Sequence, residues 1–185
     1  EELFARIKAV YKQQDKETLS PEQHKLLEDI YNGFVRNGAN LLGEDKEKYR
    51  ALCKELSLLT LQFSENNLKE TNDYKLVITD KSQLAGLPES AVEAAAETAG
   101  EKGVEGWVFT LQAPSYGPFL TYADSRDLRR ELYMAYNTKC THDNASNNLE
   151  IVKKLANVRM EIAQLLGYDN FAEYNLQERM AQNSE

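Results

Sequence analysis

Apolar side chains recur every three or four positions along most of the chain, a pattern typical of helices that bury one face. One helix is predicted to begin after Ser20, because Pro21 suits the first helical position and Gln23 completes a capping box. Its apolar stripe ends at Asn37-Gly38, a pair suited to the left-handed turn that follows many helices. An earlier stripe consists of Leu3, Phe4, Ile7, Val10 and Tyr11. Residues 1–37 are therefore predicted to form a helical hairpin.

The longest periodic segment covers residues 44–72. Its apolar positions are Tyr49, Leu52, Leu56, Leu58, Leu59, Leu61 and Phe63. At about 1.5 Å per residue, one helix of this length would reach roughly 40 Å. We predict a single long helix whose apolar face belongs to the core.

The hydrophobic period changes to two in YKLVIT (residues 74–79) and WVFTL (107–111), which are rich in β-branched and aromatic side chains. Both segments are predicted to be strands. Pro88 opens an alanine-rich helix between them that ends at Gly100. The segment FLTYA is predicted to add an edge strand, since the proline before it removes a ladder donor. Residues 74–122 should thus form a small sheet with an inserted helix.

Residues 124–181 again have helical spacing. Asp124 is predicted to cap the first of these C-terminal helices, Gly167 to end the second, and Asp169 to cap the last. A polar loop, CTHDNASNN, separates the first two. Helices should therefore dominate this part of the chain.

Composition is that of a folded protein, with 185 residues of which 42% are hydrophobic and 28% charged. No linker, repeat or low-complexity tract divides the chain, so residues 1–185 are predicted to form one domain. The predicted fold class is mainly α (α+β), a multi-helix lobe with a small minor sheet. Because the chain begins without Met and stops directly after a helical pattern, we also expect it to be a segment of a longer protein.

Charge and hydropathy exclude several classes of protein. The net charge of −8, with 30 acidic residues among the 22 basic ones, argues against nucleic-acid binding. The apolar runs are too short to cross a membrane, and the first residues lack the layout of a signal peptide. Cys53 and Cys140 are interpreted as reduced thiols, because two such distant cysteines make no disulfide framework.

Catalytic chemistry is not visible in the residues. His24 lies in a capped helix and is interpreted as a solvated side chain. Cys140, His142 and Asp143 lie close together in sequence, but a zinc site needs three or four fixed ligands and a nucleophile needs a base within reach. Acidic pairs at helical spacing, such as Glu93 and Glu97, are typical of a solvated face. We therefore predict no catalytic residue and no metal ligand, and we assign no substrate-binding residue.

The chain contains ten tyrosines, which is a high number, and four of them lie in one stretch of the sequence: Tyr116, Tyr122, Tyr133 and Tyr136. Tyrosine suits the lining of a groove, where an apolar ring meets water. The favoured interpretation is that these rings seal the packing of helix against sheet. The sequence leaves both alternatives open.

Four segments resemble the N-terminal half of the thimet-oligopeptidase family of zinc metallopeptidases, and most of all its bacterial peptidyl-dipeptidase (dipeptidyl carboxypeptidase) branch. They are LSLLTLQFSENNLKETN (56–72), LAGLPESAVEAAAE (84–97), WVFTLQAPSYGPFLTYADSRDLRRELYMAYNTK (107–139) and RMEIAQLLGYDNFAEYNLQERMA (159–181). The most specific motifs are the Leu-Ala-Gly-Leu-Pro turn, the expected Tyr-x-Pro-Phe strand with the helix that ends in Ala-Tyr-Asn-Thr, and the Leu-Leu-Gly-Tyr junction. Together they are far more specific than any one alone.

The resemblance implies a large, mostly helical, two-lobed peptidase with a deep channel, in which a His-Glu-x-x-His helix and a later Glu hold zinc. No position of this chain matches that motif, so no catalytic or metal residue is carried over. The implied function is hydrolysis of short peptides with release of C-terminal dipeptides, and this segment would form the channel wall. The partners implied are peptide substrates and the missing C-terminal catalytic half, and the expected compartment is the cytoplasm or the periplasm.

Two alternatives remain. One is an endopeptidase of the same family, which would cut internal bonds. The choice of an exopeptidase depends on residues that bind the C-terminus of a substrate, and none can be assigned in this chain. A helical interaction module without a catalytic parent is also compatible with the composition. A His-Glu-x-x-His motif downstream of these residues would distinguish the peptidase from the module.

The wide apolar faces of the helices lead to one physical expectation. We expect the isolated chain to fold and to expose apolar surface, mainly on its terminal helices, that other parts of the protein cover. The small sheet and the helix over residues 44–72 are expected to be internally packed. Self-association of the isolated chain would follow, because burial yields roughly 25 cal/mol per Å² of apolar surface.

Overall fold

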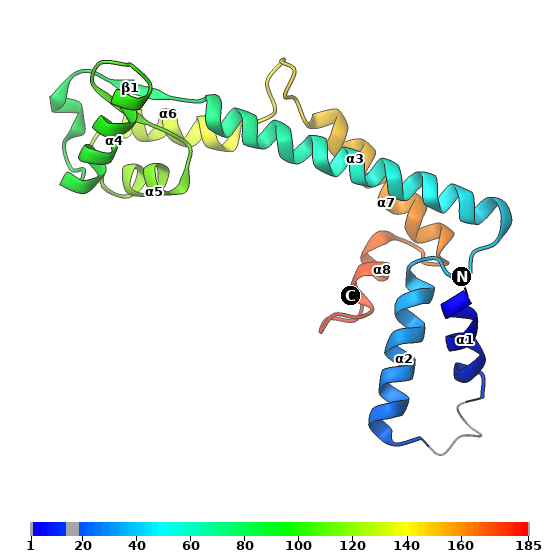
Figure 1. The fold of residues 1–185 in the computed structure, drawn as a ribbon. Coiled ribbons are helices and arrows are strands. Elements are labelled where there is room, and N and C mark those ends of the chain that lie inside the picture. The colour runs from blue at the N-terminus through cyan, green and yellow to red at the C-terminus, as the bar shows by residue number, and fades with distance from the viewer. Residues whose placement is uncertain (1, 14–18, 185) are drawn as a thin grey trace. The chain divides into compact units, whose positions relative to one another are not determined.

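A computed structural model describes residues 2–13 and 19–184 (Figure 1). The described chain contains eight α-helices, one short 3-10 helix and a two-stranded sheet, which confirms the mainly α fold class. The chain groups into two compact units, Glu1–Leu58 with Leu155–Glu185 and Leu59–Lys154. That residues 1–185 form one domain stays a prediction, and residues 1, 14–18 and 185 of the expected elements lie outside the described residues.

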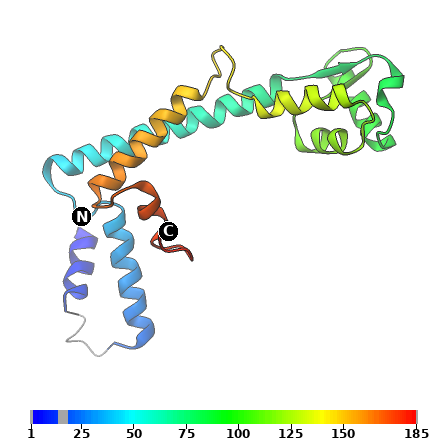
Figure 2. The ribbon, with the colours of Figure 1, turned by 180° about the vertical axis from the view of Figure 1, so that it is seen from behind.

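The first unit opens with the predicted hairpin, made of α1 (Glu2–Tyr11) and α2 (Pro21–Arg36). These helices lie side by side in Figures 1 and 2. The capping box forms as predicted, since Ser20 Oγ accepts the Gln23 N–H at 3.3 Å and Gln23 Oε1 accepts the Ser20 N–H at 2.9 Å. Stacked rings join the helices, with the centroids of Tyr11 and Tyr31 3.8 Å apart. The buried ring of Phe4 stacks on the same Tyr31.

Gly38 ends the hairpin with φ +76°, the left-handed conformation that the sequence predicted. A Cβ at this position would lie 2.9 Å from the ring of Tyr49, so the close approach also requires glycine. The long helix α3 (Gly43–Asp73) follows and confirms the expectation of a single helix. The predicted burial of its apolar face is wrong, because among the described side chains of α3 Leu52 alone is buried. Leu58 and Leu61 are 58% and 55% exposed.

The C-terminal part of the chain contains α7 (Leu149–Leu165) and α8 (Phe171–Leu176). Gly167, at φ +89°, follows α7 as predicted. The predicted cap at Asp169 is one residue early. Asn170 caps α8 instead, since its Oδ1 accepts the Glu173 N–H at 3.0 Å. The four turn-forming residues after α8 end the helical pattern earlier than the predicted boundary at residue 181.

The second unit is built around strands β1 (Leu76–Ile78) and β2 (Trp107–Phe109). They pair antiparallel, with Val77 opposite Val108. The two predicted strands are thus confirmed, although each is shorter than the segment predicted for it, 74–79 and 107–111. Helix α4 (Glu89–Glu101) lies between them in sequence, after the 3-10 helix η2 (Lys81–Leu84), and packs against β2 (Figure 1). The core consists of Leu76, Ile78, Leu84, Ala95, Phe109, Leu111, Phe119, Ala123 and Leu132.

The predicted third strand is wrong, because FLTYA lies in and just after helix α5 (Ala113–Tyr122). Pro118 lies inside this helix, where it removes one backbone hydrogen bond. The helix instead gains the complete burial of Phe119, whose ring meets the buried ring of Phe109 edge-on at 4.6 Å. Tertiary packing of this aromatic pair therefore outweighs the local preference of proline.

Helix α6 (Arg126–Asn137) completes the second unit. Its predicted cap at Asp124 is also one residue early, since Ser125 Oγ accepts the Leu128 N–H at 3.4 Å. The backbone N–H of Asp124 donates to the Ala85 carbonyl oxygen at 2.9 Å. This bond fixes the residue before the cap against the Leu-Ala-Gly-Leu-Pro turn. Neither α6 nor any other described helix combines the length and apolar composition that a membrane span requires.

Candidate functional site

The histidines considered from sequence lie on separate elements, and the paired carboxylates lie on a third. His24 lies partly buried in α2, and His142 is exposed in the loop before α7. Glu93 and Glu97 are exposed on α4, as expected of a solvated face. Across the described residues, no group of three or more His, Cys, Asp or Glu side chains is placed to hold a metal ion. The absence of catalytic residues from the chain stays a prediction.

Cys140 is a buried side chain rather than an exposed nucleophile. Its residue is 3% exposed, and its backbone adopts φ +58°. Burial raises the pKa of the Cys140 thiol, and the nearby Glu70 carboxylate raises it further. His142 Nε2 lies 3.4 Å from Thr138 Oγ1, which gives the imidazole a neighbour other than the thiol. The sequence neighbours Cys140 and His142 are therefore a packed group and an exposed group, not a nucleophile and its base.

Glu70, on the last turns of α3, anchors the loop that carries these residues. Its Oε2 accepts the Cys140 N–H at 2.5 Å, and its Oε1 accepts the Asn144 side-chain amide at 2.8 Å. Burial raises the pKa of Glu70, but these two hydrogen bonds and the nearby His142 and Lys69 lower it more, so the net pKa lies below 4.5. Glu70 thus holds a charged carboxylate under the loop.

A second anchor lies at the start of α7. Asn148 is 4% exposed; its Nδ2 donates to the Phe63 carbonyl oxygen at 3.1 Å, and its Oδ1 accepts the Asn66 amide at 2.8 Å. Sequence reasoning missed both Glu70 and Asn148. The asparagines of the loop before α7 were the one signal in the sequence that could have indicated these anchors, because asparagine side chains often form hydrogen bonds with backbone groups in irregular segments.

The four tyrosines do not line one groove. Tyr116 and Tyr136 stack with centroids 4.3 Å apart, which fits the interpretation that these rings seal packing. Tyr122 and Tyr133 are 53% and 52% exposed. The tyrosine cluster therefore divides into a packed pair and two surface rings.

The second unit contains two hollows that are lined by residues other than these four tyrosines. The first, of about 460 Å³, lies between the end of α3, one face of α4 and the start of α5. The second, of about 690 Å³, lies between the end of α3, α6 and the loop before α7, and it includes Lys69, Glu70, Lys139 and His142. The charges of the second hollow are mixed, whereas the first has an apolar floor and a polar rim.

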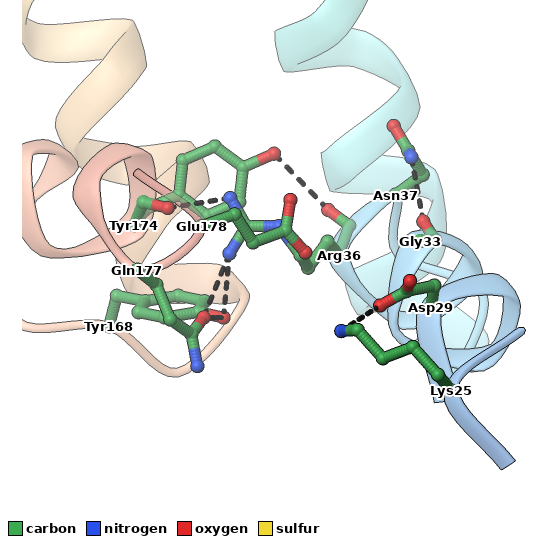
Figure 3. Close-up of polar contacts among 9 residues, drawn as sticks. All are labelled: Lys25, Asp29, Gly33, Arg36, Asn37, Tyr168, Tyr174, Gln177 and Glu178. Carbon is green, nitrogen blue, oxygen red and sulfur yellow. Dashed lines mark hydrogen bonds and ion pairs between the residues drawn. The ribbon is translucent and has the colours of Figure 1, made fainter. Parts of the chain in front are cut away.

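In the first unit, the main polar cluster joins the end of α2 to α8 through Arg36 (Figure 3). Arg36 Nη2 donates to the Tyr174 carbonyl oxygen at 2.6 Å, and Nη1 donates to Gln177 Oε1 at 2.8 Å. Arg36 Nε lies 3.2 Å from Glu178 Oε1, and the guanidinium carbon lies 4.5 Å from the centre of the Tyr174 ring. Every nitrogen of the guanidinium is thus engaged, so this cluster holds the helices together and offers no free cation.

Comparisons with known proteins show which proteins the chain is similar to. Residues 119–185 match the model of "Peptidase family M3". Oligopeptidase A of Haemophilus influenzae is 37% identical over 165 residues, which cover 87% of this chain and 24% of that protein. Oligopeptidase A of Escherichia coli is 36% identical over 90% of this chain and 25% of that protein. Dipeptidyl carboxypeptidase of Escherichia coli is 34% identical over 100% of this chain and 27% of that protein.

The chain spans about a quarter of the length of these relatives. Both oligopeptidase A and dipeptidyl carboxypeptidase are similar to it at closely comparable identities, so the comparisons do not favour one branch. The family resemblance seen in the four sequence segments is confirmed. The chain is thus similar to proteins of peptidase family M3 over most of its length, and its residues 119–185 match the model of that family.

Proposed function

We propose that this chain is the channel-wall part of a larger zinc-dependent peptidase that hydrolyses short peptides. The observation that carries the proposal is the similarity to oligopeptidase A and dipeptidyl carboxypeptidase, at 34–37% identity over 87–100% of the chain. The relatives are about four times longer, which leaves room for a catalytic part outside these residues. Peptides are accordingly the proposed substrates and the remainder of the parent protein the proposed partner.

The zinc of the proposed peptidase does not fit the side chains described here. A catalytic zinc site needs three protein ligands, most often histidines with a carboxylate or cysteine. The described part of the chain brings no such group together, and its two histidines lie in different units. We therefore place the zinc ligands and the general base in the parent protein outside residues 1–185, and derive no catalytic step from this chain.

The proposed contribution of this chain is selection of substrates by size. A deep channel walled by rigid helices admits short unfolded peptides and excludes folded proteins. The long helix α3 leaves Leu58, Leu61 and Leu68 exposed, which suits a helix that is covered elsewhere in the parent. The wall would act without touching the metal.

For the products, we propose release of C-terminal dipeptides, with cleavage at internal bonds as the alternative. Relatives of both names are similar to this chain, so the two products are separated by experiment. The full-length parent would be incubated with N-blocked peptides of graded length, and the fragments identified by mass spectrometry. Dipeptides from the C-terminus support the first proposal, whereas internal cuts replace it with the alternative.

The isolated chain itself is proposed to be inactive and to bind no stoichiometric zinc. Purified chain would be loaded with zinc, dialysed against a weak chelator and assayed for both metal and peptide cleavage. A zinc-to-protein ratio near one would contradict the proposal. The compartment also stays a proposal, with the cytoplasm expected and the periplasm as the alternative.

The rival proposal is a non-catalytic helical module. Adjoining sequence discriminates between the two, because a peptidase parent requires a His-Glu-x-x-His motif downstream of this chain. The family match favours the peptidase.

A further inference from the structure

The smaller hollow of the second unit has the character of a ligand site. Its volume of about 460 Å³ lies within the range of roughly 300–1,000 Å³ that is typical of small-molecule sites. Three elements and the end of α3 build it, so its walls belong to the packed part of the unit. The lining residues are Thr71, Asn72, Ala91, Ala94, Ala95, Thr98, Lys102, Phe109, Thr110, Gln112, Pro114 and Ser115.

The floor of this hollow is apolar. Ala91, Ala94 and Ala95 come from one face of α4, and their short side chains leave the space open. The buried ring of Phe109 on β2 lies below, and Pro114 of α5 closes one side. Apolar contacts and no charged group would therefore meet the body of a ligand.

The rim of the hollow carries two side-chain donors that no described acceptor uses, on Asn72 and Lys102. Gln112 Nε2 donates to Asn72 Oδ1 at 2.7 Å, which leaves the Asn72 amide nitrogen without an acceptor within the described chain. The Lys102 ammonium likewise has no hydrogen bond or ion pair to a described residue. Of the described lining residues, Lys102 alone is charged, and no carboxylate is among them. The rim thus complements a negative group, although the chain as a whole carries a net charge of −8.

We propose that this hollow binds a small organic monocarboxylate with an apolar aryl or short alkyl body. The apolar body would lie over the alanines of α4 and the ring of Phe109, and the carboxylate would accept hydrogen bonds from Lys102 and Asn72. A cationic ligand is disfavoured, because it would meet the Lys102 ammonium without a compensating carboxylate. The site is separate from the proposed peptide hydrolysis, since it needs neither the zinc nor the rest of the parent.

The test uses three probes that share one body and differ in charge: hydrocinnamate, its neutral amide, and phenylpropylamine. Amide NMR spectra of the 185-residue chain would be recorded through a titration with each. We expect saturable shifts at Thr98, Phe109 and Ser115 with hydrocinnamate. The neutral amide should bind several-fold more weakly, and the amine should give no saturable shift at these positions. Equal affinity for the three probes, or no saturable shift with hydrocinnamate, would overturn the proposal.

Variants localise the site. Ala94→Trp fills the hollow from its exposed edge and should abolish the saturable shifts, while Ala96→Trp, on an exposed position of α4 that does not line the hollow, should leave them unchanged. Lys102→Met should weaken hydrocinnamate binding roughly two- to five-fold, the range of an exposed ion pair, with no change for the neutral amide. Shifts that persist in Ala94→Trp would place binding elsewhere and contradict the assignment. The comparison of the three probes needs no variant, so the proposal is decided even if Ala94→Trp does not fold.

Discussion

Arg36 provides the sharpest prediction for the stability of the first unit. Its side chain is 13% exposed, and its guanidinium joins α2 to the segment Tyr174–Glu178 by hydrogen bonds, an ion pair and ring contact (Figure 3). Arg36→Met keeps much of the aliphatic stem and removes every polar contact. The perturbation therefore isolates the connection between α2 and α8.

The magnitude follows from the separate contacts. A hydrogen bond from a charged donor is worth about 1.5 kcal/mol or more when partly buried, and the bond to the Tyr174 carbonyl oxygen is of this kind. The ring contact adds about 0.5–1 kcal/mol, and the pair with Glu178, which is 57% exposed, adds about 0–1 kcal/mol. The sum predicts a loss of about 2 to 3.5 kcal/mol, or roughly 30- to 300-fold in the equilibrium for undocking α8.

Hydrogen exchange of the α8 amides measures this equilibrium directly. Protection in α8 should fall by the stated factor in Arg36→Met and by less in Arg36→Lys, which keeps the charge but not the planar donors. Arg50→Met is the matched control, because the only ion pair that Arg50 makes with a described residue is an exposed one with Glu47 on one helix turn. It should change stability by about 0.5 kcal/mol or less. Unchanged exchange in α8 of Arg36→Met would refute the inference that this cluster holds the helices together.

Three further predictions concern the loop anchor, the core and the surface. The pKa of Glu70 is lowered from 4.5 in the folded state, so its contribution to stability should be complete above pH 4.5 and lost as the pH falls through the folded-state pKa. Glu70→Gln should remove this part of the pH dependence of stability, measured by denaturation at a series of pH values. An unchanged pH dependence would contradict the prediction. Phe119→Ala should lower the free energy of unfolding of the second unit by about 3–5 kcal/mol. Leu61→Ala, at a position of α3 that is 55% exposed, should lower it by much less, and equal losses would contradict the assigned core. The isolated chain should self-associate, because Leu3, Leu26 and Met180 are exposed, and light scattering across a concentration series would measure this. A strict monomer that binds no hydrophobic dye would refute the prediction.

Local signals in the sequence predicted the elements that depend on local chemistry. The capping box at Ser20 and the left-handed glycines Gly38 and Gly167 each specify a backbone geometry through neighbouring residues, and the structure has them where expected. The strands were recognisable because their β-branched and aromatic residues alternate. The predicted caps at Asp124 and Asp169 each lie one residue early, because Asp-Ser and Asp-Asn present two good caps in a row and tertiary contacts choose between them.

Burial and long-range contacts were harder to predict. The proline before Phe119 indicated a strand, but contact with Phe109 decides for a helix. The apolar stripe of α3 indicated a core face, yet a stripe shows only that a helix has a face to cover, not that the same chain covers it. Glu70 could not be singled out, because its role comes from two donors 70 and 74 residues away in sequence. The ligand hollow likewise depends on residues from separate elements.

Cleavage of short peptides by the full-length parent is the most direct test of the central proposal, that this chain is the channel-wall part of a larger zinc-dependent peptidase. N-blocked oligopeptides and a folded protein would be offered to the parent before chelation, after chelation and after zinc is restored, with the isolated 185-residue chain assayed in parallel. We predict that the parent cuts the peptides but not the folded protein, that chelation abolishes and zinc restores this activity, and that the isolated chain is inactive throughout. A parent that leaves the peptides intact with zinc bound, or an isolated chain that cuts them, would contradict the account.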